Sequence, residues 1–122
     1  MANAQRRRRV ADEIQRVLAD IIHLELKDPR VGLVTLTGVE VSQDLAHAKI
    51  FFSRLGNAEE QKQAELGLRS AAGFLRVFLG RQIKVRNTPE LHFIYDASIE
   101  SGMRISNLID EALAPQSGKI LG

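Results

Sequence analysis

The chain has 122 residues, of which 44% are hydrophobic and 26% are charged, which is enough for one domain with a hydrophobic core. It has no cysteine, so disulfide frameworks, thiolate zinc sites and cysteine nucleophiles are excluded. No segment approaches the roughly 18 consecutive apolar residues of a membrane span, and no apolar secretory-signal region follows the basic start. We therefore expect a cytoplasmic protein with no membrane partner.

The first predicted element is an amphipathic helix. Its apolar side chains repeat with the period of one helix face: Val10, Ile14, Val17, Leu18 and Ile21. Asp28-Pro29 predicts the end of this helix, because the residue before a proline is disfavoured in the helical region. Gly32 predicts the turn that follows.

Two strands and a short turn come next, over residues 33–42 and 46–55. The short link between them predicts an antiparallel hairpin. In the first strand the apolar positions change phase after Gly38, and a one-residue slip at a glycine predicts a β-bulge at Thr37-Gly38. In the second strand Phe51 lies on the face opposite Phe52, among polar neighbours, and we expect it in the core or at its edge.

A helical segment follows, with Asn57 as its N-cap and Glu60 placed to complete a capping box. Its apolar stripe consists of Ala64, Leu68, Ala71, Leu75 and Phe78. Gly67 and Gly73 lie inside the segment, and each costs about 1 kcal/mol relative to alanine in a helix interior. Either the helix is broken near residues 70–73, or another backbone approaches closely there.

The last predicted elements are a strand over residues 91–95 and a helix that ends at Pro115. The apolar stripe of that helix is Ile105, Leu108, Ile109, Ala112 and Leu113. Three strands with helices on one face make an α+β two-layer sandwich. We expect one domain over residues 1–114 and a flexible tail over 115–122. Most of the five phenylalanines and the tyrosine lie on apolar stripes and are expected in the core.

Residue patterns of enzymes are scarce. The histidines His23, His47 and His92 stand alone, without H-E-x-x-H spacing, and neither a phosphate-binding glycine loop nor a G-x-S-x-G motif is present. Asp96 and Glu100 share one helix face at i, i+4 and would suit a metal, but helix capping explains Asp96 more simply. We expect no catalytic residue, no metal, no cofactor and no small-molecule substrate.

The basic residues gather in two clusters: Arg6, Arg7, Arg8 and Arg9, then Arg76, Arg81, Lys84 and Arg86. Segregated positive charge is typical of a polyanion-binding face, although a solvated surface with scattered arginines would look the same. The first cluster occupies either the first turns of the first helix or a frayed arm before it, and we favour an arm that becomes ordered on RNA. In an extended segment, Lys84 and Arg86 would point the same way, with Val85 inward, which suits neighbouring phosphates.

Several short motifs occur in one order along about residues 4–113. They are Asp28-Pro29-Arg30, Val39-Glu40-Val41-Ser42, Ala71-Ala72-Gly73-Phe74, Thr88-Pro89-Glu90-Leu91 with Phe93 and Asp96, and Ser101-Gly102-Met103-Arg104 with Ser106. In these motifs the chain resembles the bacterial ribosome-binding factor A family. The resemblance implies a type II KH-like fold. KH domains clamp nucleic-acid backbone with a G-x-x-G loop, which this sequence lacks; the family has an Ala-x-Gly kink instead, which corresponds to Ala71 and Gly73.

The resemblance also implies a function. The family binds the free small (30S) ribosomal subunit, assists late maturation and end processing of its precursor rRNA, including at low temperature, and does not cleave RNA. We therefore expect a monomeric ribosome biogenesis factor that grips rRNA with the two basic clusters and later releases it. Two alternatives stay open: a metal-dependent nuclease that uses Asp96 and Glu100, and a protein-interaction module that docks a helical stripe on a partner.

Overall fold

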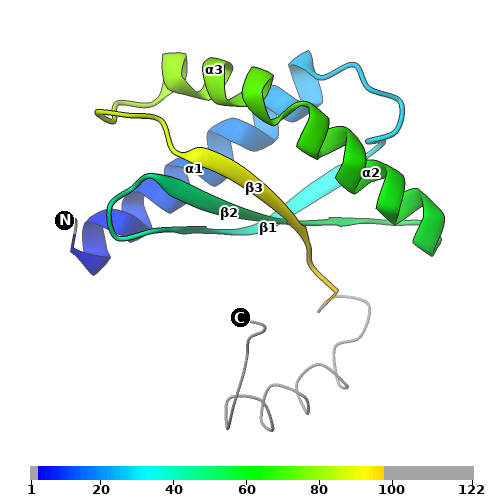
Figure 1. The fold of residues 1–122 in the computed structure, drawn as a ribbon, viewed down its shortest axis with the longest axis horizontal. Helices are drawn as coiled ribbons and strands as arrows, with labels where there is room; N and C mark the ends of the chain where they lie inside the picture. The colour runs from blue at the N-terminus through cyan, green and yellow to red at the C-terminus, as the bar shows by residue number, and fades with distance from the viewer. Residues whose placement is uncertain (1–2, 98–122) are drawn as a thin grey trace, which may run out of the picture.

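The computed structural model describes residues 3–97 (Figure 1). The elements are α1 (Ala4–Glu25), β1 (Val34–Val41), β2 (His47–Arg54), α2 (Ala58–Ser70), α3 (Ala72–Gln82) and β3 (Glu90–Tyr95). This order confirms the predicted α+β arrangement. The predicted last helix, the tail over 115–122 and Glu100 lie outside the described residues. Within residues 3–97, every helix is too short or too polar to cross a lipid bilayer.

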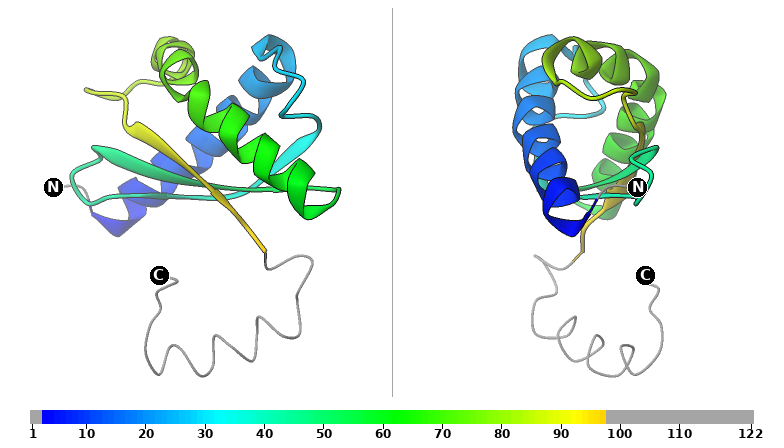
Figure 2. Two further views of the ribbon diagram at one scale, coloured as in Figure 1. Left: turned by 45° about the vertical axis from the view of Figure 1, so that its right-hand side comes forward. Right: turned by 90° about the vertical axis from the view of Figure 1, so that its left-hand side faces the viewer.

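The sheet has the strand order β1-β2-β3 and is mixed. β1 and β2 form the predicted antiparallel hairpin, whereas β2 and β3 are parallel. Parallel strands need a long crossover connection, and α2 and α3 supply it (Figure 2). Ala48, Ile50 and Phe52 of β2 are buried beneath the helices, and the alternate residues of the strand point to the other face.

One hydrophobic core lies between the helices and the sheet. Its largest fully buried side chains include Ile14 and Leu18 of α1, Phe52 of β2 and Phe93 of β3. Phe51 is half-buried on the opposite face, as expected. The prediction is wrong for Phe74, which is 46% exposed. It lies on α3, where Leu75 and Leu79 are the residues that point into the core.

The predicted β-bulge is confirmed. Leu36 pairs with Phe52 and Gly38 pairs with Phe51, so Thr37 is left between the two pairs. The Thr37 hydroxyl donates a hydrogen bond to Oδ2 of Asp96 at 2.6 Å, just beyond the end of β3. The bulge thus ties β1 to the end of β3 through the Asp96 carboxylate.

The capping box at the start of α2 is also confirmed. Oδ1 of Asn57 accepts a hydrogen bond from the Glu60 backbone N–H at 2.8 Å, and Oε1 of Glu60 accepts one from the Asn57 N–H at 2.9 Å. We expect Asn57→Ala to lower the free energy of unfolding by about 1 kcal/mol, measured by urea denaturation. Asn57→Ser, which retains a capping oxygen, is the control; equal losses in both variants would contradict a capping role.

The helical segment is broken at Ala71, as predicted. Ala71 has φ −89° and ψ 0°, α2 ends at Ser70 and α3 begins at Ala72. A close approach occurs as well, but at Gly67 and through a side chain. A Cβ atom at Gly67 would lie 2.8 Å from Cγ2 of the buried Val31. Gly67 therefore lets α2 pack on the segment that follows α1.

Candidate RNA-binding surface

The fold brings the two predicted basic clusters to one end of the molecule. The start of α1, the β1–β2 turn and the segment between α3 and β3 lie together there (Figures 1 and 2). A groove at this end is lined by Arg6, Gln43, Asp44, Leu45, Ala46, Arg86 and Asn87. One arginine from each cluster thus lines the same depression, although the two lie far apart in the sequence.

The first cluster is helical, so the prediction of an arm is wrong. Asn3 is the N-cap of α1, and its Oδ1 accepts a hydrogen bond from the Arg6 backbone N–H at 2.7 Å. Arg6, Arg8 and Arg9 are exposed. Arg7 is half-buried because it falls on the helix face that continues into Ala11. The first turn contains no acidic residue that would offset the exposed guanidinium groups.

The β1–β2 turn lines the same groove as the two arginines. Oδ1 of Asp44 accepts hydrogen bonds from the Ser42 hydroxyl at 2.6 Å and from the Ala46 N–H at 3.0 Å. The bond from Ser42 and then that from Ala46 hold the pKa of Asp44 below its usual value. Leu45 takes a left-handed φ of 60°. The Asp44 carboxylate therefore stabilises the turn through these hydrogen bonds and stays ionised at neutral pH.

Lys84 and Arg86 behave as predicted. Both side chains are exposed, whereas Val85 between them is half-buried and packs against the core. The anchored Val85 leaves the two cations projecting into solvent from one short segment. They form the part of the second cluster that is free to meet phosphate oxygens.

Arg76 and Arg81 of α3 make contacts within the chain. Nε and Nη2 of Arg76 donate hydrogen bonds to the Thr88 carbonyl oxygen at 3.0 and 2.8 Å, which ties α3 to the segment before β3. The Arg81 guanidinium lies 5.3 Å from the ring centroid of Phe78, a cation–π distance. That ring lies 4.8 Å from the exposed Phe74. Both arginines remain exposed, but each is partly oriented by the fold.

Gly73 is not required by the fold. It is exposed, its φ is not positive, and a Cβ atom there would meet nothing within 4 Å. The helix break lies at Ala71, two residues before Gly73. Gly73 therefore neither relieves backbone strain nor makes room for a neighbouring side chain. Beside it runs a groove lined by Ala72, Gly73, Arg76, Glu90, Leu91 and His92. The kink therefore opens onto the edge of the sheet at β3.

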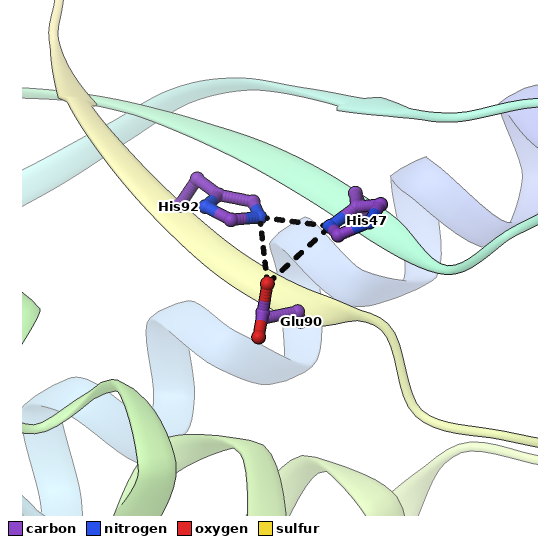
Figure 3. Close-up of side chains that lie close together, drawn as sticks. All are labelled: His47, Glu90 and His92. Carbon is purple, nitrogen blue, oxygen red and sulfur yellow. Dashed lines mark hydrogen bonds and ion pairs between the residues drawn. The ribbon is translucent and has the colours of Figure 1, made fainter.

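One cluster was missed from the sequence, and the statement that the histidines stand alone is wrong. His47 of β2 and His92 of β3 lie side by side, with Nδ1 of His47 3.0 Å from Nε2 of His92 (Figure 3). Oε1 of Glu90 lies 3.4 Å from each of these nitrogens. His92 lies in the predicted strand 91–95, and Glu90 directly precedes that strand, so their spacing of two residues was the only local sign of the cluster. The parallel pairing that adds His47 could not be read from the sequence.

Comparison with known proteins is consistent with this geometry. Residues 6–109 match the family model described as ribosome-binding factor A. The ribosome-binding factor A of Nitrosospira multiformis is 60% identical over 106 residues, which cover 87% of this chain and 84% of that protein. The crystal structure of ribosome-binding factor A from Thermus thermophilus superposes with a TM-score of 0.65 at 27% identity, covering 73% of this chain and 94% of that one.

A second Thermus thermophilus structure bears on the partner. It is a homology model of ribosome-binding factor A fitted into a cryo-electron-microscopy map of a complex with the 30S subunit. It matches with a TM-score of 0.61 at 28% identity, covering 71% of this chain and 91% of that one. The order of elements, the family model and the identity over most of the chain agree, and this chain belongs to the ribosome-binding factor A family.

Proposed function

We propose that this protein is a non-catalytic, monomeric assembly factor of the cytoplasm that binds the free small ribosomal subunit through its rRNA. The observation that carries the proposal is the groove in which Arg6 and Arg86 meet. Membership of the family and the 30S complex of the Thermus thermophilus relative support the choice of partner. In this role the protein assists late maturation and end processing of the precursor rRNA, including at low temperature.

The mechanism we propose is a clamp on the rRNA backbone. Arg6, Arg8 and Arg9 are exposed on α1, and Lys84 and Arg86 are exposed on the segment between α3 and β3. Arg6 and Arg86 line the same groove. Guanidinium groups form charge-assisted, often bidentate hydrogen bonds with phosphate oxygens. Such contacts carry no base sequence information, so selectivity would come from the shape of a folded rRNA junction.

The kink extends this surface. Because Gly73 is exposed and has no neighbour at its Cβ position, an RNA backbone has room to come close to α3 there. Exposed Phe74 lies next to it and offers a ring for stacking on an unpaired base. Arg7, Arg76 and Arg81 would add positive charge while the fold holds their side chains.

The nuclease alternative has less support. Asp96, one of its two acids, accepts a hydrogen bond from Thr37 that links β1 to the end of β3. A carboxylate in that position has a structural role. Incubation of the pure protein with precursor rRNA and Mg²⁺ tests this directly, and cleavage would overturn the non-catalytic assignment.

The first test of the proposal is co-sedimentation of the full chain with purified small subunits, large subunits and joined ribosomes across a salt series. We expect binding to the small subunit alone, with an affinity that falls steeply as salt rises, because phosphate contacts release counterions. Equal binding to all three particles, or none, would contradict the proposal. Selective binding that ignores salt would favour docking on a ribosomal protein instead.

A further inference from the structure

The strand pairing fixes three metal-binding side chains on one face of the sheet. In the parallel register of β2 and β3, His47 lies opposite Glu90, and His92 follows two residues further along β3. Residues two apart on a strand share a face. This is the face opposite Ala48, Leu91 and the helices. The cluster is therefore set by backbone hydrogen bonds of the sheet and does not depend on a loop.

The distances within the cluster fit a tetrahedral metal ion. The donor atoms Nδ1 of His47, Nε2 of His92 and Oε1 of Glu90 form a triangle with sides of 3.0, 3.4 and 3.4 Å. Bonds of about 2.0–2.2 Å from a tetrahedral zinc ion separate neighbouring donor atoms by about 3.3–3.6 Å. The triangle thus comes close to one face of such a tetrahedron, and one ion above it would reach all three atoms.

The donor types select the class of ion. Two imidazoles and one carboxylate are the ligands of known zinc sites that keep a fourth position open. Imidazole nitrogen favours Zn²⁺, Co²⁺, Ni²⁺ and Cu²⁺ over Mg²⁺ and Ca²⁺. The side chains of His47, Glu90 and His92 are 57%, 57% and 46% exposed, so an ion can enter from solvent.

Hydrogen bonding alone accounts less well for the cluster. One ring nitrogen of the His47–His92 pair must act as acceptor, and both distances to Glu90 are longer than the 2.7–3.2 Å typical of N–H···O bonds. Two cations lie near the cluster: Lys49, which is opposite His92, and Arg76, which lines the adjoining groove. The Arg76 guanidinium is engaged by the Thr88 carbonyl oxygen.

We propose that His47, Glu90 and His92 form a binding site for one divalent transition-metal ion of the zinc type, with a fourth position open to water or an external ligand. All three ligands belong to this chain, so the proposed metal binding does not require the ribosome and does not depend on the proposed function. It adjoins the groove beside Gly73, because Glu90 and His92 line both.

The test uses the full chain without a polyhistidine tag, stripped with chelator, and titrated calorimetrically with ZnCl₂. We expect saturation at one ion per chain, a rise in Tm with zinc because the ion binds the folded state, and visible absorption bands of four-coordinate Co²⁺ when cobalt is added. Mg²⁺ should produce neither effect.

The variants are His47→Ala, Glu90→Gln and His92→Ala, with His23→Ala as the matched control. His23 lies on α1, where Nε2 is 3.2 Å from the Val34 carbonyl oxygen. Each ligand variant should weaken zinc binding by about tenfold or more, since even changes beyond the direct ligands cost 10–100-fold; His23→Ala should not. All three ligands are exposed, and circular dichroism checks folding. No saturable binding by the unaltered chain, or equal binding by the double variant His47→Ala/His92→Ala, would overturn the proposal.

Discussion

Charge reversal at both Lys84 and Arg86, to glutamate, is expected to weaken binding of the chain to small ribosomal subunits by about 100-fold or more. Each residue would lose a charge-assisted hydrogen bond to phosphate, worth about 1.5–3 kcal/mol, and every 1.4 kcal/mol is a factor of ten in affinity. Repulsion by the new carboxylates adds to the loss. Both side chains are exposed, so the fold should be unaffected. Co-sedimentation at fixed salt measures the change.

The matched control reverses two exposed cations elsewhere, Lys27 after α1 and Lys62 on α2. It changes the net charge by the same amount but leaves the basic end of the molecule intact. We expect a much smaller loss from it. A neutral variant, Lys84→Gln/Arg86→Gln, should also reduce the slope of log affinity against log salt by about 2, or about 1 per lost phosphate contact. Equal losses in both reversed variants would assign the effect to net charge and contradict a localised surface.

Alanine at the two helical glycines is expected to have opposite effects. Gly67→Ala should lower the free energy of unfolding by about 1–3 kcal/mol, because the new methyl group would press on buried Val31 and force it to shift. Gly73→Ala should leave stability unchanged or raise it by up to about 1 kcal/mol, since the site is open and alanine favours helix. Urea denaturation of the two variants measures both.

The same pair separates folding from function. If RNA backbone approaches α3 at the kink, Gly73→Ala weakens subunit binding although the chain is as stable as before. Gly67→Ala should leave the affinity of the folded fraction unchanged. Undiminished binding by Gly73→Ala would remove the kink from the proposed surface, while the arginine groove would stand.

Local signals in the sequence predicted much of the fold. The phase change after Gly38 marked the bulge, Asn57 with Glu60 marked the capping box, and the glycines pointed to the helix break at Ala71. Each of these depends on residues close together in the chain. Asn3, the N-cap of α1, is also a local signal of this kind, since asparagine is a preferred N-cap residue, and it places the arginine run inside the helix.

The candidate surface was only half predictable. The two basic clusters are visible as charge runs, and the alternation around Val85 follows from an extended backbone. Their meeting in one groove depends on how α1 lies relative to the segment before β3, which is a long-range property. The same holds for His47 and His92, whose contact requires the parallel register of β2 and β3. The hydrogen bond of Arg76 could not be predicted, because its acceptor is a backbone carbonyl oxygen and every residue has one.

The groove has a consequence for the order of events during synthesis. Its two arginines, Arg6 and Arg86, enter from opposite ends of the described chain, so it closes only after α3 has packed and the following segment has left the ribosome exit tunnel. Contacts between residues so far apart in sequence form late, because the intervening loop must first be closed. A nascent chain that displays Arg6–Arg9 alone carries positive charge without a shaped site. In the proposed role, selective recognition of the small subunit would therefore be restricted to molecules in which the groove has formed.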